Sequence, residues 1–150
     1  MNVKQTFIKE QVMKNYRISW EEYALRIAQT ASLRSEDPYT KVGACALDHS
    51  NRVIGVAYNG LAPGVEVTEE FWADRDKRRP FMIHAEANLL SLFKRGECNI
   101  LACTLLPCSC CATMISAYGI KRVIFKDFYH KDPLALQIFA KNNIECKQIF

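Results

Sequence analysis

The chain has 150 residues, of which 49% are hydrophobic and 24% are charged. This composition is ordinary for a globular protein and gives no sign of intrinsic disorder. The length fits one domain over residues 1–150, and no apolar run approaches the ~20 residues of a membrane span.

The net charge and the cysteine content indicate which binding partners and which cellular compartment to expect. The net charge is +4, and the basic residues are spread out apart from residues 75–79, the basic segment. A charge this diffuse makes nucleic acid an unexpected partner, whereas the basic segment suits a phosphate on a small molecule. Seven cysteines fit metal ligation and buried strands better than a disulfide framework. Since the N-terminus also lacks the apolar stretch of a secretory signal, we expect a cytoplasmic protein.

Hydrophobic periodicity and turn signals predict alternating helices and strands. The first helix spans 20–28, with Ser19 as its N-cap. Two strands over 42–47 and 52–58 form a hairpin around the turn at 48–51. The later elements are a helix entered at His84 and continuing to 93, a strand over 100–105, a helix from Cys108 to near Gly119, a strand over 122–125, a helix over 133–141 and a strand over 144–149.

Strands that alternate with helices in the second half predict a mostly parallel sheet there. With the hairpin included, we predict an α/β fold of three α-β-α layers, in which a five-stranded mixed sheet has helices on both faces. Residues 1–18 form an N-terminal extension. No element is predicted between 59 and 80, and a loop of that length in a compact domain is usually functional. Phe71 and Trp72 in this loop favour burial or ligand contact.

Two short motifs carry the chemistry, His84-Ala85-Glu86 and Pro107-Cys108-Ser109-Cys110-Cys111. Cys108 and Cys111 are three residues apart, so on a helix both thiolates can reach one ion, and Pro107 suits the first turn of that helix. His84 supplies a third ligand, and Glu86 points at the same site only if His84 stands at the entry of its helix. This pattern resembles the signature of zinc-dependent deaminases.

A zinc ion with three protein ligands keeps a fourth tetrahedral position for water. Zinc can lower the pKa of such a water from ~15.7 to roughly 7, which makes a nucleophile available at neutral pH. Glu86, close to the ion but not bound to it, would move protons from the water to the ring nitrogen and the leaving amine. We therefore predict hydrolytic deamination of an amino-substituted heterocycle, with one catalytic Zn²⁺ per subunit.

Other interpretations of the same residues remain open. Cys103, Cys110 or Cys146 could complete a four-cysteine structural zinc site that leaves His84 uninvolved. The Cys-x-x-Cys pair could be a redox pair, although this gives the His-x-Glu motif no role. The chain could also be a non-enzymatic zinc-stabilised binding module, in which Glu86 would be dispensable.

The resemblance extends to one branch of the deaminases, the deoxycytidylate (dCMP) deaminase family. It covers roughly residues 20–150, and the matching segments, in order, are residues 34–45, 57–60, 84–88, 106–108 and 119–124. The zinc motif marks only the superfamily, whereas Asp37-Pro38 and Tyr58-Asn59-Gly60 point to the dCMP branch. The resemblance implies a cytidine-deaminase-like fold and conversion of dCMP to dUMP for thymidylate synthesis.

The resemblance also implies roles for particular residues. His84, Cys108 and Cys111 would hold zinc, with Glu86 as the catalytic residue. Asn59 would hydrogen-bond the sugar 3′-hydroxyl, the Ala85 backbone would contact the pyrimidine, and Tyr129 would contact the substrate. Candidates for the 5′-phosphate are Arg34, Lys41 and the basic segment.

Members of this family are typically hexamers, activated by dCTP and inhibited by dTTP, with Mg²⁺ on the triphosphate effector. In this chain Gly60 and Gly64, in the loop after Asn59, are the candidate effector residues. Val65 cannot ligate a metal and stands where relatives carry a cysteine, which argues against the second structural zinc of some relatives. The alternative function is that of another zinc deaminase, acting on cytidine or on an RNA base.

Overall fold

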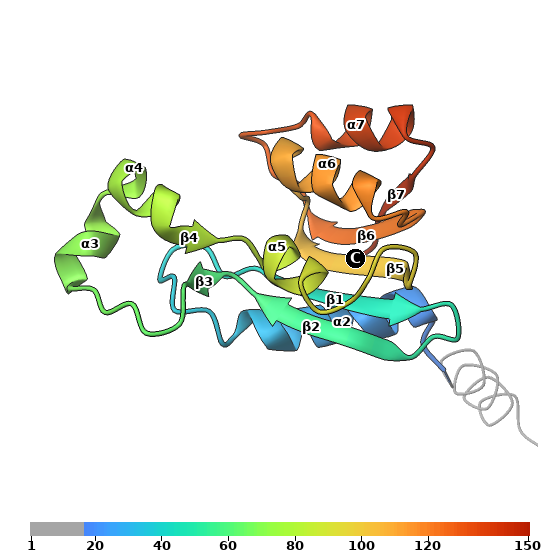
Figure 1. Cartoon of the computed structure of the whole chain (residues 1–150), viewed down its shortest axis with the longest axis horizontal. Helices are drawn as coiled ribbons and strands as arrows, with labels where there is room; N and C mark the ends of the chain where they lie inside the picture. The colour runs from blue at the N-terminus through green and yellow to red at the C-terminus, as the bar shows by residue number, and fades with distance from the viewer. Residues whose placement is uncertain (1–16) are drawn as a thin grey trace, which may run out of the picture.

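The computed structural model describes residues 17–150, so the predicted N-terminal extension falls almost entirely outside the described residues. A five-stranded sheet with helices packed on it forms the main body, and a smaller lobe extends from one end (Figure 1). No described helix combines the length and the apolar character needed to cross a membrane.

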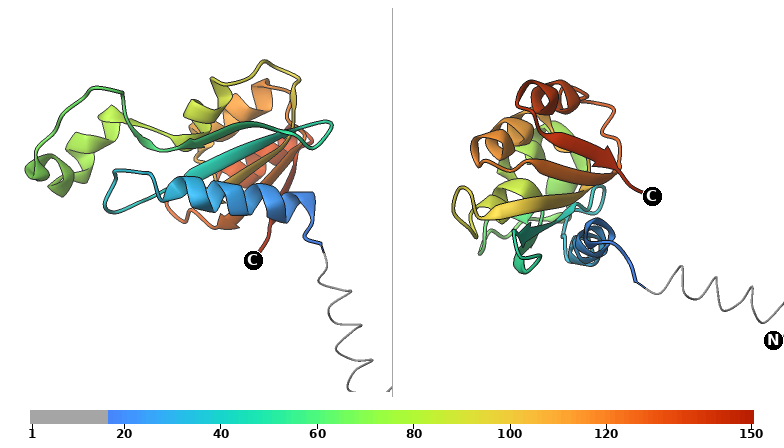
Figure 2. Two further views of the ribbon diagram at one scale, coloured as in Figure 1. Left: turned by 90° about the horizontal axis from the view of Figure 1, so that it is seen from below. Right: turned by 90° about the vertical axis from the view of Figure 1, so that its right-hand side faces the viewer.

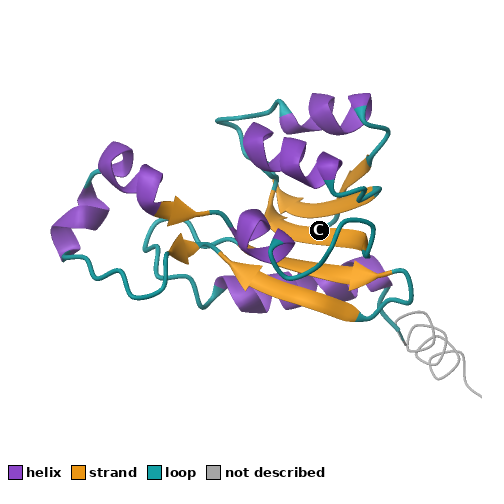
Figure 3. Cartoon of the chain, in the orientation of Figure 1, coloured by secondary structure: helices purple, strands orange, loops and turns teal. Residues whose placement is uncertain are grey.

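The elements of the main body match the predicted ones, with ends that shift by a few residues. Its helices are α2 (Trp20–Ser32), α5 (Ala85–Leu90), α6 (Ser109–Ala117) and α7 (Ala135–Lys141). Its strands are β1 (Gly43–Asp48), β2 (Val53–Tyr58), β5 (Cys98–Leu105), β6 (Arg122–Asp127) and β7 (Glu145–Gln148). The lobe, residues 60–83, contains β3 (Gly60–Leu61), α3 (Glu69–Ala73), α4 (Arg75–Arg78), the 3-10 helix η1 (Arg79–Phe81) and β4 (Met82–Ile83) (Figure 3).

The strand order in the main sheet is β2-β1-β5-β6-β7. β1 and β2 form the predicted hairpin, in which Oδ1 of Asp48 accepts hydrogen bonds from the Ser50 and Arg52 amides at 2.8 and 2.9 Å. β1 also pairs antiparallel with β5, whereas β5, β6 and β7 run parallel. The predicted mixed sheet with a parallel second half is therefore confirmed.

Separate apolar clusters lie on the two faces of the sheet, because successive residues of a strand point to opposite sides. On the face covered by α2, the cluster includes Leu25 and Leu47. On the face covered by α5, α6 and α7, it includes Leu89 and Leu101. The side views in Figure 2 show α2 alone on its side of the sheet. The predicted three-layer arrangement is confirmed.

The start of α2 and its close packing on β1 both follow from single residues. Ser19 is the predicted N-cap, and its Oγ accepts a hydrogen bond from the Glu22 amide at 3.1 Å. Gly43, the first residue of β1, lies directly beneath the helix, and a Cβ at this position would come within 1.8 Å of the Ala28 carbonyl oxygen. The helix can therefore lie this close only over a residue without a side chain.

The expectation that residues 59–80 contain no regular element is wrong. β3 pairs antiparallel with β4, and two short helices and η1 lie between them. Each of these elements has two to five residues, too few for a periodic apolar pattern to appear. A capping signal was nevertheless present, because Oδ1 of Asp74 accepts hydrogen bonds from the Asp76 and Lys77 amides that begin α4. Phe71 packs edge to face on Trp72 and Phe81.

Candidate functional site

His84 follows β4 directly and is the N-cap of α5, with extended backbone angles of φ −69° and ψ 149°. Because its backbone is not yet helical, its side chain is not confined to the spacing of a regular helix. His84 and Glu86, two residues apart, therefore line the same pocket. The position of His84 at the helix entry, which the sequence required for this motif, is confirmed.

The two cysteines of the second motif open α6, directly after β5. Cys108 is the N-cap, and its Sγ accepts a hydrogen bond from the Cys111 amide at 3.5 Å. Cys111 is the third helical residue and is buried. The prediction that Pro107 lies in the first turn is wrong, because the Cys108 thiol caps the helix and the first turn begins at Ser109.

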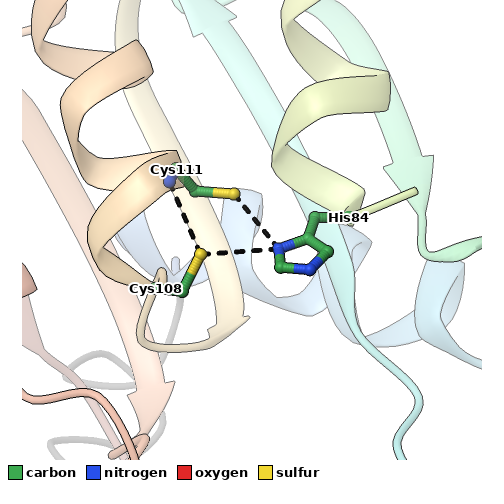
Figure 4. Close-up of side chains that lie close together, drawn as sticks. All are labelled: His84, Cys108 and Cys111. Carbon is green, nitrogen blue, oxygen red and sulfur yellow. Dashed lines mark hydrogen bonds between the residues drawn. The ribbon is translucent and has the colours of Figure 1, made fainter. Parts of the chain in front are cut away.

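The side chains of His84, Cys108 and Cys111 converge on one point (Figure 4). The imidazole Nδ1 lies 3.3 Å from the Cys111 sulfur and 3.5 Å from the Cys108 sulfur, and all three ligand atoms lie within 4.8 Å of one another. Zinc bonds of ~2.0–2.3 Å in a tetrahedron place neighbouring ligand atoms about 3.5–3.8 Å apart. The nitrogen and sulfur atoms therefore fit a zinc ion with little rearrangement.

The three side chains of the cluster shift one another's pKa values. A hydrogen bond from Cys111, followed by one from His84, holds the pKa of Cys108 well below its usual range. The hydrogen bond with Cys108 also raises the pKa of His84. The pKa of the Cys111 thiol is raised by its hydrogen bond with Cys108 and by burial. A metal cation bound here would compete with these protons, because thiolates and neutral imidazole are the forms that ligate zinc.

Glu86 is only 4% exposed, although it lines the pocket beside His84. Burial raises the pKa of its carboxyl group, while the nearby His84 opposes this rise. A carboxyl group whose pKa lies above its usual range can hold and release a proton closer to neutral pH than an exposed one. Its placement is the one required of a general acid and base.

The alternative four-cysteine site does not form in the described part of the chain. Among residues 17–150, His84, Cys108 and Cys111 are the one group of three or more potential ligands that could share a metal ion. Cys103 is fully buried and Cys110 is exposed. All seven cysteines lie in the described residues, and each is free of disulfide bonds.

A pocket of about 750 Å³ opens beside the His84–Cys108 cluster. Of the residues predicted to contact substrate, Asn59, Ala85 and Tyr129 all line it. Gly60 and Gly64, the predicted effector residues, do not line it, nor do the phosphate candidates Arg34 and Lys41. Three residues of the basic segment do, Arg75, Arg78 and Arg79. The wall includes further residues that sequence reasoning did not assign: Asp37, Thr40, Lys131 and Asp132.

Asn59 uses both polar atoms of its side chain within the protein. Its Oδ1 accepts a hydrogen bond from the Val42 amide, and its Nδ2 donates one to the Thr40 carbonyl, both at 2.9 Å. Asn59 therefore joins the end of β2 to the segment before β1. An amide side chain has two donor hydrogens and two acceptor lone pairs, so each atom keeps one further capacity for a ligand.

Positive side chains also line the pocket. Arg75, Arg78, Arg79 and Lys131 line it, and none of them has a carboxylate within salt-bridge distance among the described residues. Arg78 is 8% exposed, and its guanidinium stacks on the Tyr39 ring at 4.7 Å from the centroid. A buried guanidinium without a carboxylate partner is costly unless an anion binds to it. The same pocket therefore combines potential metal ligands with positive side chains that suit an anion.

Comparison with known proteins agrees with this geometry. Residues 18–127 match the family model described as the cytidine and deoxycytidylate deaminase zinc-binding region. The deoxycytidylate deaminase of Homo sapiens is 33% identical over 123 residues, an alignment that covers 75% of this chain and 68% of the human protein.

Solved structures share the fold. The dCMP deaminase of cyanophage S-TIM5 in its apo form aligns with a TM-score of 0.71 at 22% identity, over 86% of this chain and 96% of the phage chain. The same phage enzyme in complex with dCMP and dUMP aligns with a TM-score of 0.65 at 23% identity, over 99% of both chains. The family match, the human relative and the shared fold lead to one conclusion: this chain belongs to the cytidine and deoxycytidylate deaminase family, and it is a hydrolytic enzyme.

Proposed function

We propose that this protein catalyses the zinc-dependent hydrolytic deamination of dCMP to dUMP. The observation that carries the proposal is a single pocket beside the His/Cys/Cys cluster, lined by a buried glutamate and by four positive side chains that have no carboxylate partner among the described residues. The first two features suit deamination, and the third suits a phosphorylated substrate. A relative named deoxycytidylate deaminase and a phage dCMP deaminase solved with dCMP and dUMP support this choice of substrate.

His84, Cys108 and Cys111 would hold the zinc ion, which when bound would act as a Lewis acid toward water and strengthen it as a nucleophile. Deamination adds water at C4 of the cytosine ring and releases ammonia. Glu86 would accept one proton from the attacking water and deliver it to N3 of the ring. It would then accept the second proton, from the C4 hydroxyl that the addition creates, and deliver it to the departing amino group, so that the carboxylate ends in its starting state. Its buried position in the pocket wall suits this role.

The opposite ends of dCMP would be recognised by different groups. The backbone of Ala85, between His84 and Glu86, would contact the pyrimidine, and Tyr129 would contact the substrate from the facing wall. Asn59 would use the remaining capacity of its amide for the 3′-hydroxyl of the sugar. Arg78 would bind the 5′-phosphate, assisted by the other positive side chains of the pocket, because guanidinium groups match phosphate oxygens in charge and geometry.

The substrate class can be tested with the zinc-loaded protein on dCMP, CMP, deoxycytidine and dCTP, with ammonia and the deaminated product measured together. We expect dCMP to have the highest kcat/KM and deoxycytidine, which lacks the phosphate, to be poor. Equal turnover of dCMP and deoxycytidine would contradict phosphate recognition. Cytidine and a short RNA, assayed in the same way, test the alternative: turnover of either, with none of dCMP, would support another zinc deaminase.

Effector control stays a prediction for this chain. The predicted effector loop includes Gly64, whose φ of +85° suits glycine, and Leu61, whose amide donates a hydrogen bond to Oε1 of Glu36 at 2.8 Å. A triphosphate with Mg²⁺ would have to share this loop with the Glu36 carboxylate. Rates measured with dCTP and dTTP, with and without Mg²⁺, test both the activation and the inhibition.

Assembly and cellular role are also carried by the family resemblance. A homohexamer, a cytoplasmic location and supply of dUMP to thymidylate synthesis remain predictions. Light scattering coupled to size-exclusion chromatography tests the first: a mass of six chains would support it, and a monomer would contradict it.

A further inference from the structure

One oxygen of Asp132 forms two short hydrogen bonds across the pocket wall. Its Oδ2 accepts from the backbone amide and from the Oγ hydroxyl of Ser109, each at 2.7 Å. Asp132 lies between β6 and α7, whereas Ser109 is the first residue of α6. The two residues are separated by 23 positions in the sequence, and both line the pocket.

Ser109 lies within the metal motif. It follows Cys108 directly, and the chain around it is fixed by the bond from the Cys111 amide to the Cys108 sulfur. This part of α6 is therefore held independently of Asp132. Ser109 is thus a fixed point of attachment beside the metal ligands.

Asp132 belongs to a segment that faces the substrate. Tyr129 and Lys131 in the same segment line the pocket, and the Asp132 amide closes a turn by donating to the Tyr129 carbonyl at 3.3 Å. Other polar ties of this segment are weak, since the contact from Arg75 Nη2 to the Tyr129 hydroxyl measures 3.5 Å. Among the described residues, the two bonds to Ser109 are the shortest polar link between this segment and the start of α6.

We propose that Asp132 is a positioning residue, which ties the Tyr129–Lys131 segment to the first turn of α6 and so fixes the substrate-binding side chains relative to the metal ligands. This rests on the proposed deaminase function. The alternative role for Asp132 is to stabilise α6 alone, by placing a negative charge at the N-terminus of the helix. In that role the charge would matter, whereas a tie needs only a hydrogen-bond acceptor.

The two roles can be separated because a single oxygen accepts both bonds. In Asp132→Asn the amide oxygen can accept from both groups of Ser109, although the charge is lost. In Asp132→Ala both bonds are lost. Asp48→Ala is a matched control, since Asp48 likewise uses one carboxylate oxygen to accept two hydrogen bonds, in the β1–β2 turn and outside the pocket wall.

The first measurement compares kcat and KM for dCMP, together with zinc content, in the wild type and the three variants. We expect Asp132→Ala to raise KM about ten-fold or more, because a displaced binding group weakens substrate contacts, with kcat changed much less and zinc retained. Asp132→Asn should restore a KM close to that of the wild type, and Asp48→Ala should leave it unchanged. Equal KM in all four proteins, or loss of zinc in Asp132→Ala, would overturn the proposal.

Hydrogen exchange followed by mass spectrometry gives a second readout that does not depend on turnover. Asp132→Ala should speed exchange in peptides that cover residues 128–133, and Asp132→Asn and Asp48→Ala should not. Unchanged exchange in Asp132→Ala would overturn the tie. If the wild type fails to deaminate dCMP, the proposed function fails, and the exchange result still decides whether Asp132 holds the segment.

Discussion

The imidazole Nδ1 of His84 lies 3.5 Å from the sulfur of Cys108, although 24 residues separate them in the sequence. Each of the two residues is the N-cap of its helix, α5 for His84 and α6 for Cys108. The metal cluster therefore forms where two helices begin beside each other, next to the strand β5 that leads into the second.

Removal of one ligand should abolish tight metal binding. We expect His84→Ala to lower zinc affinity by more than about a hundred-fold, since even partners of metal ligands are worth ten- to a hundred-fold. Zinc content after dialysis, measured by mass spectrometry of the metal, provides the test. Cys146→Ala is the control, because Cys146 lies on β7 outside the cluster and should leave the zinc content unchanged. Full zinc occupancy in His84→Ala would contradict the assignment.

Arg78 should distinguish nucleotides from nucleosides. Loss of a charge-assisted hydrogen bond to phosphate costs about 1.5–3 kcal/mol, so Arg78→Ala should lower kcat/KM for dCMP by roughly ten- to a hundred-fold. Deoxycytidine, which has no phosphate, should be affected little. Arg78→Lys keeps the charge and should show a smaller loss of kcat/KM for dCMP. Arg52→Ala, on the exposed β1–β2 hairpin, serves as the control. An equal loss for both substrates would mean that Arg78 supports the fold rather than the phosphate.

Gly43 should tolerate no side chain. In Gly43→Ala the new Cβ would lie 1.8 Å from the Ala28 carbonyl oxygen and 2.7 Å from the Ser32 amide nitrogen, so α2 must move away from β1. We expect a loss of about 3 kcal/mol or more in the free energy of unfolding. Gly64→Ala meets no atom within 4 Å but has a φ of +85°, and it should cost only about 1 kcal/mol. Urea denaturation of both variants compares the cost of a steric clash, at Gly43, with that of backbone strain, at Gly64. Equal losses in the free energy of unfolding would contradict the close packing of α2 on β1.

Buried thiols should make the fold sensitive to alkaline pH. Burial raises the pKa of Cys45 from its ordinary value of 9.0 to about 12. Below pH 9 the thiol is protonated in both folded and unfolded chains, whereas between pH 9 and 12 it ionises only when the chain unfolds. The free energy of unfolding should therefore fall as pH rises through this window. Cys45→Ala should show a shallower fall in denaturation midpoint from pH 9 to 11, and an unchanged slope would contradict the burial of this thiol.

The sequence was sufficient for the main body because its helices and strands are long enough to show a hydrophobic period. The Ser19 cap and the β1–β2 turn were predictable from capping and turn residues, and the parallel second half from the alternation of strands with helices. The His84, Cys108 and Cys111 cluster was predictable because zinc chemistry demands those residue types at close spacing. The elements of the lobe were not, since helices as short as α4, with four residues, carry no period and depend on a cap such as Asp74.

The pocket's positive side could be predicted only in part. The basic segment was visible as a cluster in the sequence, but its place in the same pocket as His84 depends on the pairing of β3 with β4, which returns the chain from the lobe to α5. Lys131 and Asp132 reach the pocket through the connection between β6 and α7, and contacts over such sequence distances leave no local signal. The bonds between Asp132 and Ser109 are contacts of this long-range type.

The measurement that tests the central claim most directly is the conversion of dCMP to dUMP by the zinc-loaded wild type and by Glu86→Gln, with zinc content determined in both. Glutamine preserves the shape of the buried side chain but cannot carry the proton. The account predicts dUMP formation by the wild type and a loss of at least about a hundred-fold in kcat for the variant, with zinc retained. Comparable turnover by both proteins, or none by the zinc-loaded wild type, would contradict it.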